Sequence, residues 1–209
     1  MKFDVKHIFI ISLLLATVFI SGCASPLKIN YVPLENPDNH LASISPVMIK
    51  LSYLVDKREG AAQANLIGEK LTGMQVGKED VKSQDSVLEI IRQAMKSELT
   101  RNGHTVTDIN EDINIKGELK YFWLKTDINS ENGADIASWD VIAEIKILLE
   151  TENTSTGKSA IFGPYYSRNS QKRYITPNNT VMERVFEGSL SKLMKSMSSD
   201  TELASALKK

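Results

Sequence analysis

The sequence holds few of the side chains that bind transition metals or act as thiol nucleophiles. It has one cysteine, Cys23, and three histidines in 209 residues, with no HExxH motif and no neighbouring pair of histidines. Zinc sites in proteins are built from several cysteine and histidine ligands at short spacing. We therefore expect neither a metal site nor another cofactor.

Motifs of phosphate binding and of nucleophilic catalysis are also missing. Neither GxGxxG, GxxxxGK(S/T) nor GxSxG occurs in the chain. Carboxylate pairs such as Glu111 with Asp112, or Glu150 with Glu152, fall in predicted loops or on the polar face of a predicted strand. Acid–base catalysis needs environments that separate the two pKa values of such a pair. The sequence predicts that the protein is not an enzyme, and a hydrolase stays open as the weakest alternative.

An excess of charge of one sign is absent as well. The chain has 25 Lys and Arg residues against 26 Asp and Glu residues. Domains that bind nucleic acids carry a basic patch or a basic excess. We therefore expect no nucleic-acid partner.

The N-terminal residues depart most from an ordinary globular composition. Lys2 and Lys6 flank the start of an apolar run over residues 8–20. The run is shorter than the about 20 residues of a membrane-spanning helix and is typical of a signal peptide. The sequence I-S-G-C at residues 20–23 resembles the bacterial lipobox. The resemblance implies that residues 1–22 are removed as a signal peptide.

The same resemblance implies a diacylglyceryl group on the thiol of Cys23 and an acylated new amino terminus. Several acyl chains give a stable membrane anchor, and they leave the chain without a free thiol. The alternative is a buried cysteine in a short anchor helix. Ala24 follows the cysteine, and the absence of Asp at that position implies the periplasmic face of the outer membrane.

Residues 23–46 are predicted to be a lipidated tether. Four of the six prolines lie here, among Asn and Asp residues, and such a composition favours an extended linker without a core of its own. Within it, residues 27–34 alternate enough to form a short edge strand. The folded periplasmic domain is predicted to begin at residue 47 and to end at residue 209.

The domain shows both periodicities of a mixed fold. Residues 47–55, 113–128 and 138–152 alternate apolar and polar side chains, and residues 159–170 form a further strand that Gly163 and Pro164 make an edge or a bulge. The inward faces are predicted to carry Val47, Ile49, Leu51, Tyr53 and Val55, then Ile113, Ile115, Leu119, Tyr121 and Trp123, then Trp139, Val141, Ala143, Ile145, Ile147 and Leu149.

Two segments have the 3.6-residue period of amphipathic helices. The first follows Ser83 or Asp85, either of which could cap it, and ends before Gly103. The second follows Pro177 and reaches about residue 198, and Asp200 can cap a short turn after it. The predicted fold class is α+β: a two-layer sandwich of a mainly antiparallel sheet of about four to six strands with two long helices on one face. His104 follows the first helix and is predicted to be a solvated loop histidine.

The sequence VDKREG at residues 55–60 is the one polar cluster that we single out. It comes where the first strand ends, and such loops often carry function. Asp56 and Arg58 are candidates for a contact with a partner. The structural alternative is a turn in which Asp56 binds local amides and Arg58 pairs with a carboxylate.

Taken together, these features resemble the YajG-type family of uncharacterised bacterial lipoproteins. The matching pieces are, in chain order, Cys23, Asp56 with Arg58, Ile67 with Gly68, the helix exit ELTRNGHTV, and SSDTEL after the last helix. The resemblance implies a lipoprotein for which no catalytic residues are assigned. We therefore expect a non-enzymatic lipoprotein with a periplasmic binding or assembly module and an envelope protein as its partner. The alternative is an auxiliary lipoprotein of an envelope lipid-transport or biogenesis complex.

Overall fold

A computed structural model describes residues 25–60, 63–72, 77–129, 138–173 and 175–208 of the chain. The predicted signal peptide at residues 1–22 and the predicted lipidation site Cys23 lie outside the described residues. The strands are β1 Met48–Asp56, β2 Leu66–Leu71, β3 Lys78–Lys82, β4 Thr105–Val106, β5 Ile113–Asn129, β6 Ser138–Asn153 and β7 Ser159–Arg173. The helices are η1 Leu41–Ser43, α2 Val87–Arg101, α3 Asn179–Ser198 and α4 Thr201–Ala206.

The strands of the described residues form one seven-stranded mixed sheet. The long strands β5, β6 and β7 pair antiparallel as a meander. Both β1 and β2 pair parallel with the other edge of β5, one after the other along its length. β4 then pairs parallel with β1, and β3 pairs antiparallel with β2. The prediction of a mainly antiparallel sheet of about four to six strands is therefore wrong, because the crossover through α2 returns the chain to β5 in the direction of β1.

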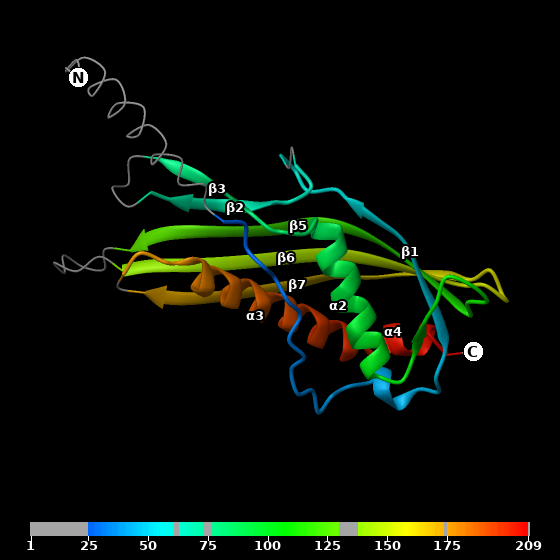
Figure 1. The fold of residues 1–209 in the computed structure, drawn as a ribbon. Coiled ribbons are helices and arrows are strands. Elements are labelled where there is room, and N and C mark those ends of the chain that lie inside the picture. The colour runs from blue at the N-terminus through cyan, green and yellow to red at the C-terminus, as the bar shows by residue number, and fades with distance from the viewer. Residues whose placement is uncertain (1–24, 61–62, 73–76, 130–137, 174, 209) are drawn as a thin grey trace, which may run out of the picture.

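The two long helices cover one face of this sheet (Figure 1). Their apolar stripes and the inward side chains of the strands form a single buried cluster, in which the rings of Phe122 and Phe186 stack with centroids 4.5 Å apart. The α+β class with its two long helices is thus confirmed. The side chains of Asn178 and Asp200 accept hydrogen bonds from backbone amides in the first turns of α3 and α4 and thereby cap these helices, as residues of their type do. Ser86 caps α2, in place of the predicted Ser83 or Asp85.

Register shifts in β1 and β5 turn side chains over to the opposite face of the sheet. The pairing of β1 with β5 shifts between Leu51 and Tyr53, and that of β5 with β6 shifts between Leu119 and Tyr121. One extra residue in a strand reverses the alternation beyond it. Tyr53, predicted to face inward, is consequently 64% exposed, and Tyr121 is 39% exposed.

The same shifts correct two further predictions. Val55 and Trp123 are only half-buried, and Leu54, Phe122 and Leu124 fill the core in place of the predicted residues. In β7 the shift falls at Gly163 and Pro164, opposite Leu148 of β6. This strand is both an edge and bulged, as its sequence predicts.

The predicted tether packs against the domain over residues 25–46. Leu27 and Ile29 are buried near the start of this segment, and Leu41 and Ile44 are buried near its end. Its backbone is tied to α3, because the amide of Lys28 donates to the Glu183 carboxylate at 2.8 Å. The described part of the segment is therefore part of the folded domain, and its predicted edge strand is reduced to a single bridge at Leu27.

The segment also explains the environment of His104, which is 3% exposed and not solvated as predicted. The backbone amide of Val47 donates to Nδ1 at 3.4 Å, and Nε2 lies 3.1 Å from the carbonyl oxygen of Leu41. These two contacts fit a neutral ring that carries its proton on Nε2. Burial lowers the pKa of His104, against a smaller opposing effect of the Leu41 carbonyl.

We expect this histidine to make stability depend on pH. The pKa of an unfolded histidine is about 6.5, and that of folded His104 is lower, so the unfolded state takes up the proton first. The free energy of unfolding should therefore decrease as the pH is lowered from about 7.5 to about 5.5. Urea titrations followed by circular dichroism measure it. His104→Gln should flatten the slope and His40→Gln should keep it. A slope that survives in the first variant would contradict the assignment.

Gly68 is required where β2 meets β5. A Cβ atom at this position would lie 2.0 Å from the carbonyl oxygen of Leu124, a backbone atom that cannot move aside. We expect Gly68→Ala to lower the free energy of unfolding by about 3 kcal/mol, at the upper end for overpacking. Gly77→Ala is the matched control, because a Cβ there meets nothing within 4 Å. Equal unfolding midpoints for the two variants would refute the close approach.

Candidate functional site

The Asp56–Arg58 pair lies at the point where β1 ends and β2 takes over beside β5. Arg58 donates from Nε to Asp56 Oδ1 at 2.9 Å and from Nη2 to Asp56 Oδ2 at 2.8 Å. Its Nη1 also donates to the carbonyl oxygens of Leu66 at 2.5 Å and Phe122 at 3.4 Å. Only 3% of the Arg58 side chain is exposed. From inside the domain, the guanidinium therefore joins the Asp56 side chain at the end of β1 to the backbone of β2 and of β5.

The electrostatics of the pair follow from this burial. Desolvation raises the pKa of Asp56, but the hydrogen bonds and charge of Arg58 outweigh it, and the net shift is downward. The contacts favour the structural alternative for these two residues, and a partner contact at Asp56 and Arg58 stays a prediction. Their neighbours Lys57 and Glu59 are exposed and point the other way.

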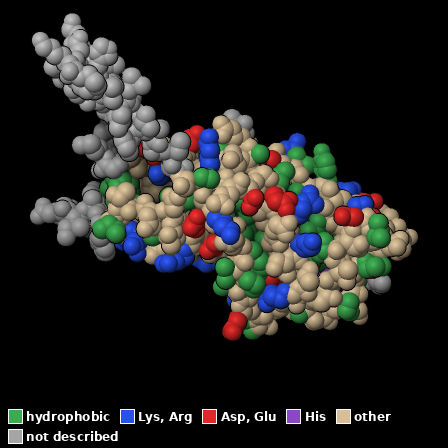
Figure 2. All heavy atoms as spheres, viewed as in Figure 1, with side chains coloured by type: hydrophobic (Ala, Val, Ile, Leu, Met, Phe, Trp, Pro, Cys, Tyr) green, Lys and Arg blue, Asp and Glu red, His purple; other side chains and the backbone are tan. Residues whose placement is uncertain are grey.

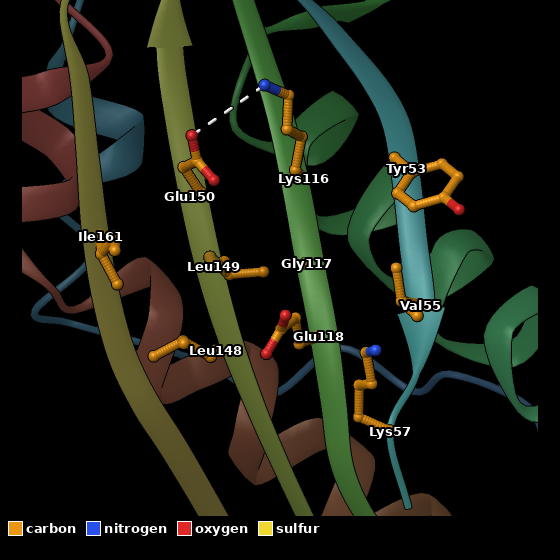
Figure 3. Close-up of a pocket in the computed structure, with 10 residues that line it drawn as sticks. All are labelled: Tyr53, Val55, Lys57, Lys116, Gly117, Glu118, Leu148, Leu149, Glu150 and Ile161. Carbon is orange, nitrogen blue, oxygen red and sulfur yellow. Dashed lines mark ion pairs between the residues drawn. The ribbon is translucent and has the colours of Figure 1, made fainter.

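The helix-free face of the sheet carries two adjoining hollows, which share Lys57 and Leu148. The first has a volume of about 420 Å³, and Figure 3 shows its lining on four neighbouring strands, with the helices behind the sheet. The second has a volume of about 650 Å³. Its lining comprises Lys57, Glu59, Lys120, Tyr121, Glu144, Lys146, Leu148, Pro164 and Tyr166.

Large exposed side chains gather at these hollows. Tyr53 and Tyr121 are turned outward by the register shifts of β1 and β5. Ile161 and Tyr166 come from the two sides of the shift in β7, and they are 68% and 52% exposed. Exposed apolar and aromatic side chains that lie together mark interaction sites, whereas single ones are ordinary. The alternating pattern of the sequence does not predict this surface, because the surface arises from the residues inserted at the register shifts.

Most charges on this face are paired with one another. Lys116 Nζ lies 2.9 Å from Glu152 Oε2. The carboxylate of Glu144 also accepts a hydrogen bond from the Tyr166 hydroxyl at 2.5 Å. Hydrogen bonding to Lys116 lowers the pKa of Glu152. By contrast, no ion pair within 4.0 Å joins Lys57 or Lys146 to any of the described carboxylates. Among the described residues, Lys57 and Lys146 thus lie at the hollows beside apolar side chains without an ion-pair contact, as does the carboxylate of Glu59 at the second hollow, and the charge of Lys57 helps to lower the pKa of Glu118.

The face of the domain that is viewed in Figure 1 carries charges of both signs. Figure 2 shows acidic and basic side chains interspersed over the face viewed in Figure 1. Among the described residues, no group of three or more His, Cys, Asp or Glu side chains could hold a metal ion. The pKa values of the Asp56, Glu118 and Glu152 carboxyl groups are all shifted downward. None of the described helices is long and apolar enough to cross a membrane.

The fold is a two-layer α+β domain with an open sheet face. A comparison with known protein families identifies the family to which the chain belongs. The family model of an uncharacterised lipoprotein matches residues 53–208. The chain belongs to this family of uncharacterised lipoproteins. The finer resemblance to the YajG type stays a prediction. No curated protein matches the chain.

A solved structure with a TM-score above 0.5 shares the fold at low sequence identity. Protein XCC0632 from Xanthomonas campestris is 8% identical and matches with a TM-score of 0.53 over 87% of this chain and 96% of that one. This likeness shows the fold alone. A minor lipoprotein from Acinetobacter baumannii is 8% identical, with a TM-score of 0.37 over 78% of this chain and 93% of that one. A putative neuraminyllactose-binding hemagglutinin homologue from Helicobacter pylori is 9% identical, with a TM-score of 0.42 over 87% and 95%.

Replacing Arg58 should destabilise the fold. In Arg58→Ala the carbonyls of Leu66 and Phe122 and the Asp56 carboxylate lose their shared donor, and removing one partner of a buried pair costs about 3 kcal/mol. Urea unfolding of the non-lipidated protein measures this loss. Arg184→Ala removes an exposed arginine of α3 and should change the free energy of unfolding by less than about 0.5 kcal/mol. Two variants of equal stability would argue for a role of Arg58 outside the fold.

Proposed function

We propose that the protein is a non-enzymatic lipoprotein, anchored through Cys23 to the periplasmic face of the outer membrane, whose domain binds an envelope protein on the helix-free face of the sheet. The observation that carries the proposal is the cluster of Tyr53, Tyr121, Ile161 and Tyr166 around two adjoining hollows. Tyrosine is enriched in protein interfaces, where its ring is buried and its hydroxyl finds a partner.

The charges of the surface indicate the chemistry of the partner. Lys57 and Lys146 lie at the second hollow beside Leu148 and Pro164. Complementary charge steers association and suppresses wrong partners. The partner segment therefore carries apolar side chains for the hollows and carboxylates for the two lysines.

The second functional hypothesis from the sequence assigns the protein to a lipid-transport or biogenesis complex. The hollows give no particular support to direct binding of an acyl chain. Four of the residues that line the first hollow, Lys57, Lys116, Glu118 and Glu150, are charged, whereas small-molecule sites are lined mostly by apolar side chains. In such a complex the same face would bind a protein subunit, and the identity of the partner would distinguish the two hypotheses.

Photo-crosslinking in intact cells tests the binding face. A photoreactive phenylalanine analogue in place of Tyr53 or Tyr166 should capture the same protein from both positions. The same analogue in place of Ile109, which is 71% exposed and does not line either hollow, should not capture it.

Charge reversal then tests the recognition chemistry. Lys57→Glu combined with Lys146→Glu should lower the yield of the adduct about tenfold, because carboxylates of the partner would meet like charges. Lys96→Glu reverses an exposed lysine of α2 and should leave the yield unchanged. An adduct yield that is unchanged by the double charge reversal, or that is equally high from position 109, would rule out this face as the specific site.

A further inference from the structure

We propose that the domain sits directly on the bilayer that holds its anchor, with the surface around Ser25 in contact with phospholipid headgroups and the turn between β6 and β7 pointing away from the membrane. This inference rests on the proposed anchor at Cys23. It replaces the flexible tether with a rigid seat, and it fixes the height of the candidate binding face.

The starting observation is that the chain is held in place from its first described residues onward. The side-chain amide of Asn179, the first residue of α3, donates to the carbonyl oxygen of Ser25 at 2.9 Å. The amide of Leu27 donates to the Lys82 carbonyl at 2.7 Å, and the Leu27 carbonyl accepts from Gln84 at 2.8 Å. Leu27 itself is 1% exposed. The segment is thus tied to both β3 and α3.

Covalent geometry then limits the distance to the anchor. Ser25 follows Cys23 by two residues, and two residues span at most about 7 Å when fully extended. The lipid on Cys23 places the sulfur at the boundary between headgroups and acyl chains. The headgroup region of a bilayer is about 5–7 Å thick on each side. The surface around Ser25 must therefore touch the headgroups.

The chemistry of this surface suits zwitterionic and anionic phospholipids. A small hollow of about 50 Å³ beside Ser25 has a mixed lining, with Lys70, Asp80, Lys82 and Asn179 as its polar residues and Leu27, Val81 and Met182 as its apolar ones. Lys28 follows Leu27 in the chain, and the Lys82 carbonyl accepts from the Leu27 amide. Neither lysine has an ion pair within 4.0 Å to a carboxylate of the described residues. A lysine near an anionic membrane surface strengthens binding to that membrane. The two ammonium groups can bind lipid phosphates.

The strands set the direction of the rest of the domain. The β2–β3 pair and the start of α3 lie towards one end of the sheet, and α4 with the turn after β6 lies at the other end (Figure 1). β6 has 16 residues, which at about 3.3 Å per residue gives a length of roughly 50 Å. Leu148, in the candidate binding face, lies ten residues from the near end of β6, or roughly 33 Å along it.

Lipid-quenching measurements on the lipidated mature protein test the arrangement. Because acylation uses Cys23, a single new cysteine can be labelled specifically. Asp80→Cys places a fluorophore beside Ser25, and Ser155→Cys places the same fluorophore on the exposed turn at the far end. In phosphatidylethanolamine and phosphatidylglycerol vesicles with a spin label on the headgroup, Asp80→Cys should be strongly quenched and Ser155→Cys should not. Equal quenching at the two positions, or none at either, would overturn the proposal.

A spacer separates the rigid seat from mere tethering. About 20 Gly and Ser residues inserted between Ala24 and Ser25 form a flexible coil of roughly 25 Å. The spacer should abolish the quenching of Asp80→Cys, although the protein still floats with the vesicles. The same insert after Lys208 should leave the quenching unchanged. Quenching that persists with the N-terminal spacer would contradict the rigid seat, because the surface would then reach the headgroups without the short link to the anchor.

Flotation distinguishes a failure of the inference from a failure of the proposed anchor. If the mature protein does not float with vesicles, or if Cys23→Ser protein floats equally well, the lipid anchor itself is wrong. If only the acylated protein floats but the two labels are quenched alike, the lipid anchor at Cys23 is supported and the fixed contact between the domain and the membrane is wrong.

Discussion

The structure depends on how the long edge of β5 is completed. β5 has 17 residues and pairs with β6 along its whole length, but β1 pairs with its other edge only as far as Leu119, and β2 begins to pair at Leu124. Backbone groups between two strands in series would lack partners, at a cost comparable to lost hydrogen bonds. Arg58 supplies donors at this junction, and Asp56 compensates its charge.

The same region produces the candidate binding face. The shifts fall in three successive strand pairings, β1 with β5, β5 with β6 and β6 with β7, and each reverses the alternation of side chains beyond it. Residues that would otherwise fill the core, such as Tyr53 and Tyr121, are turned outward, and Leu54 and Phe122 replace them inside. Lys57 follows Asp56 in the same loop, so the ion pair that holds the junction also presents a cation at both hollows. Core packing and the exposed surface therefore arise from one set of backbone irregularities.

The sequence predicts the helices well and the faces of the strands only in part. The apolar stripe of α3 is continuous, and Asn178 and Asp200 mark the helix starts by local chemistry. A bulge adds one residue without changing composition, so the period-two pattern before Tyr53 gives no sign of the reversal after it. Parallel pairing of β1 is equally hidden, because it depends on a partner some 60 residues away. The prolines of residues 25–46 suggested a linker, whereas buried Leu27 and Leu41 carried the contrary signal.

A rigid link between the proposed anchor and the candidate binding face would restrict which partners can be reached. A flexible tether would let the hollows sample many heights and orientations, and binding would depend mainly on local concentration. When Ser25 is held by β3 and α3, the strands from there to Leu148 transmit a fixed height and a fixed direction. A partner on the same membrane must then present its segment at that height, whereas a segment close to the headgroups stays out of reach. With the proposed anchor and binding face, packing of an N-terminal segment that composition marks as a linker would therefore add geometric selectivity to the chemical selectivity of the hollows.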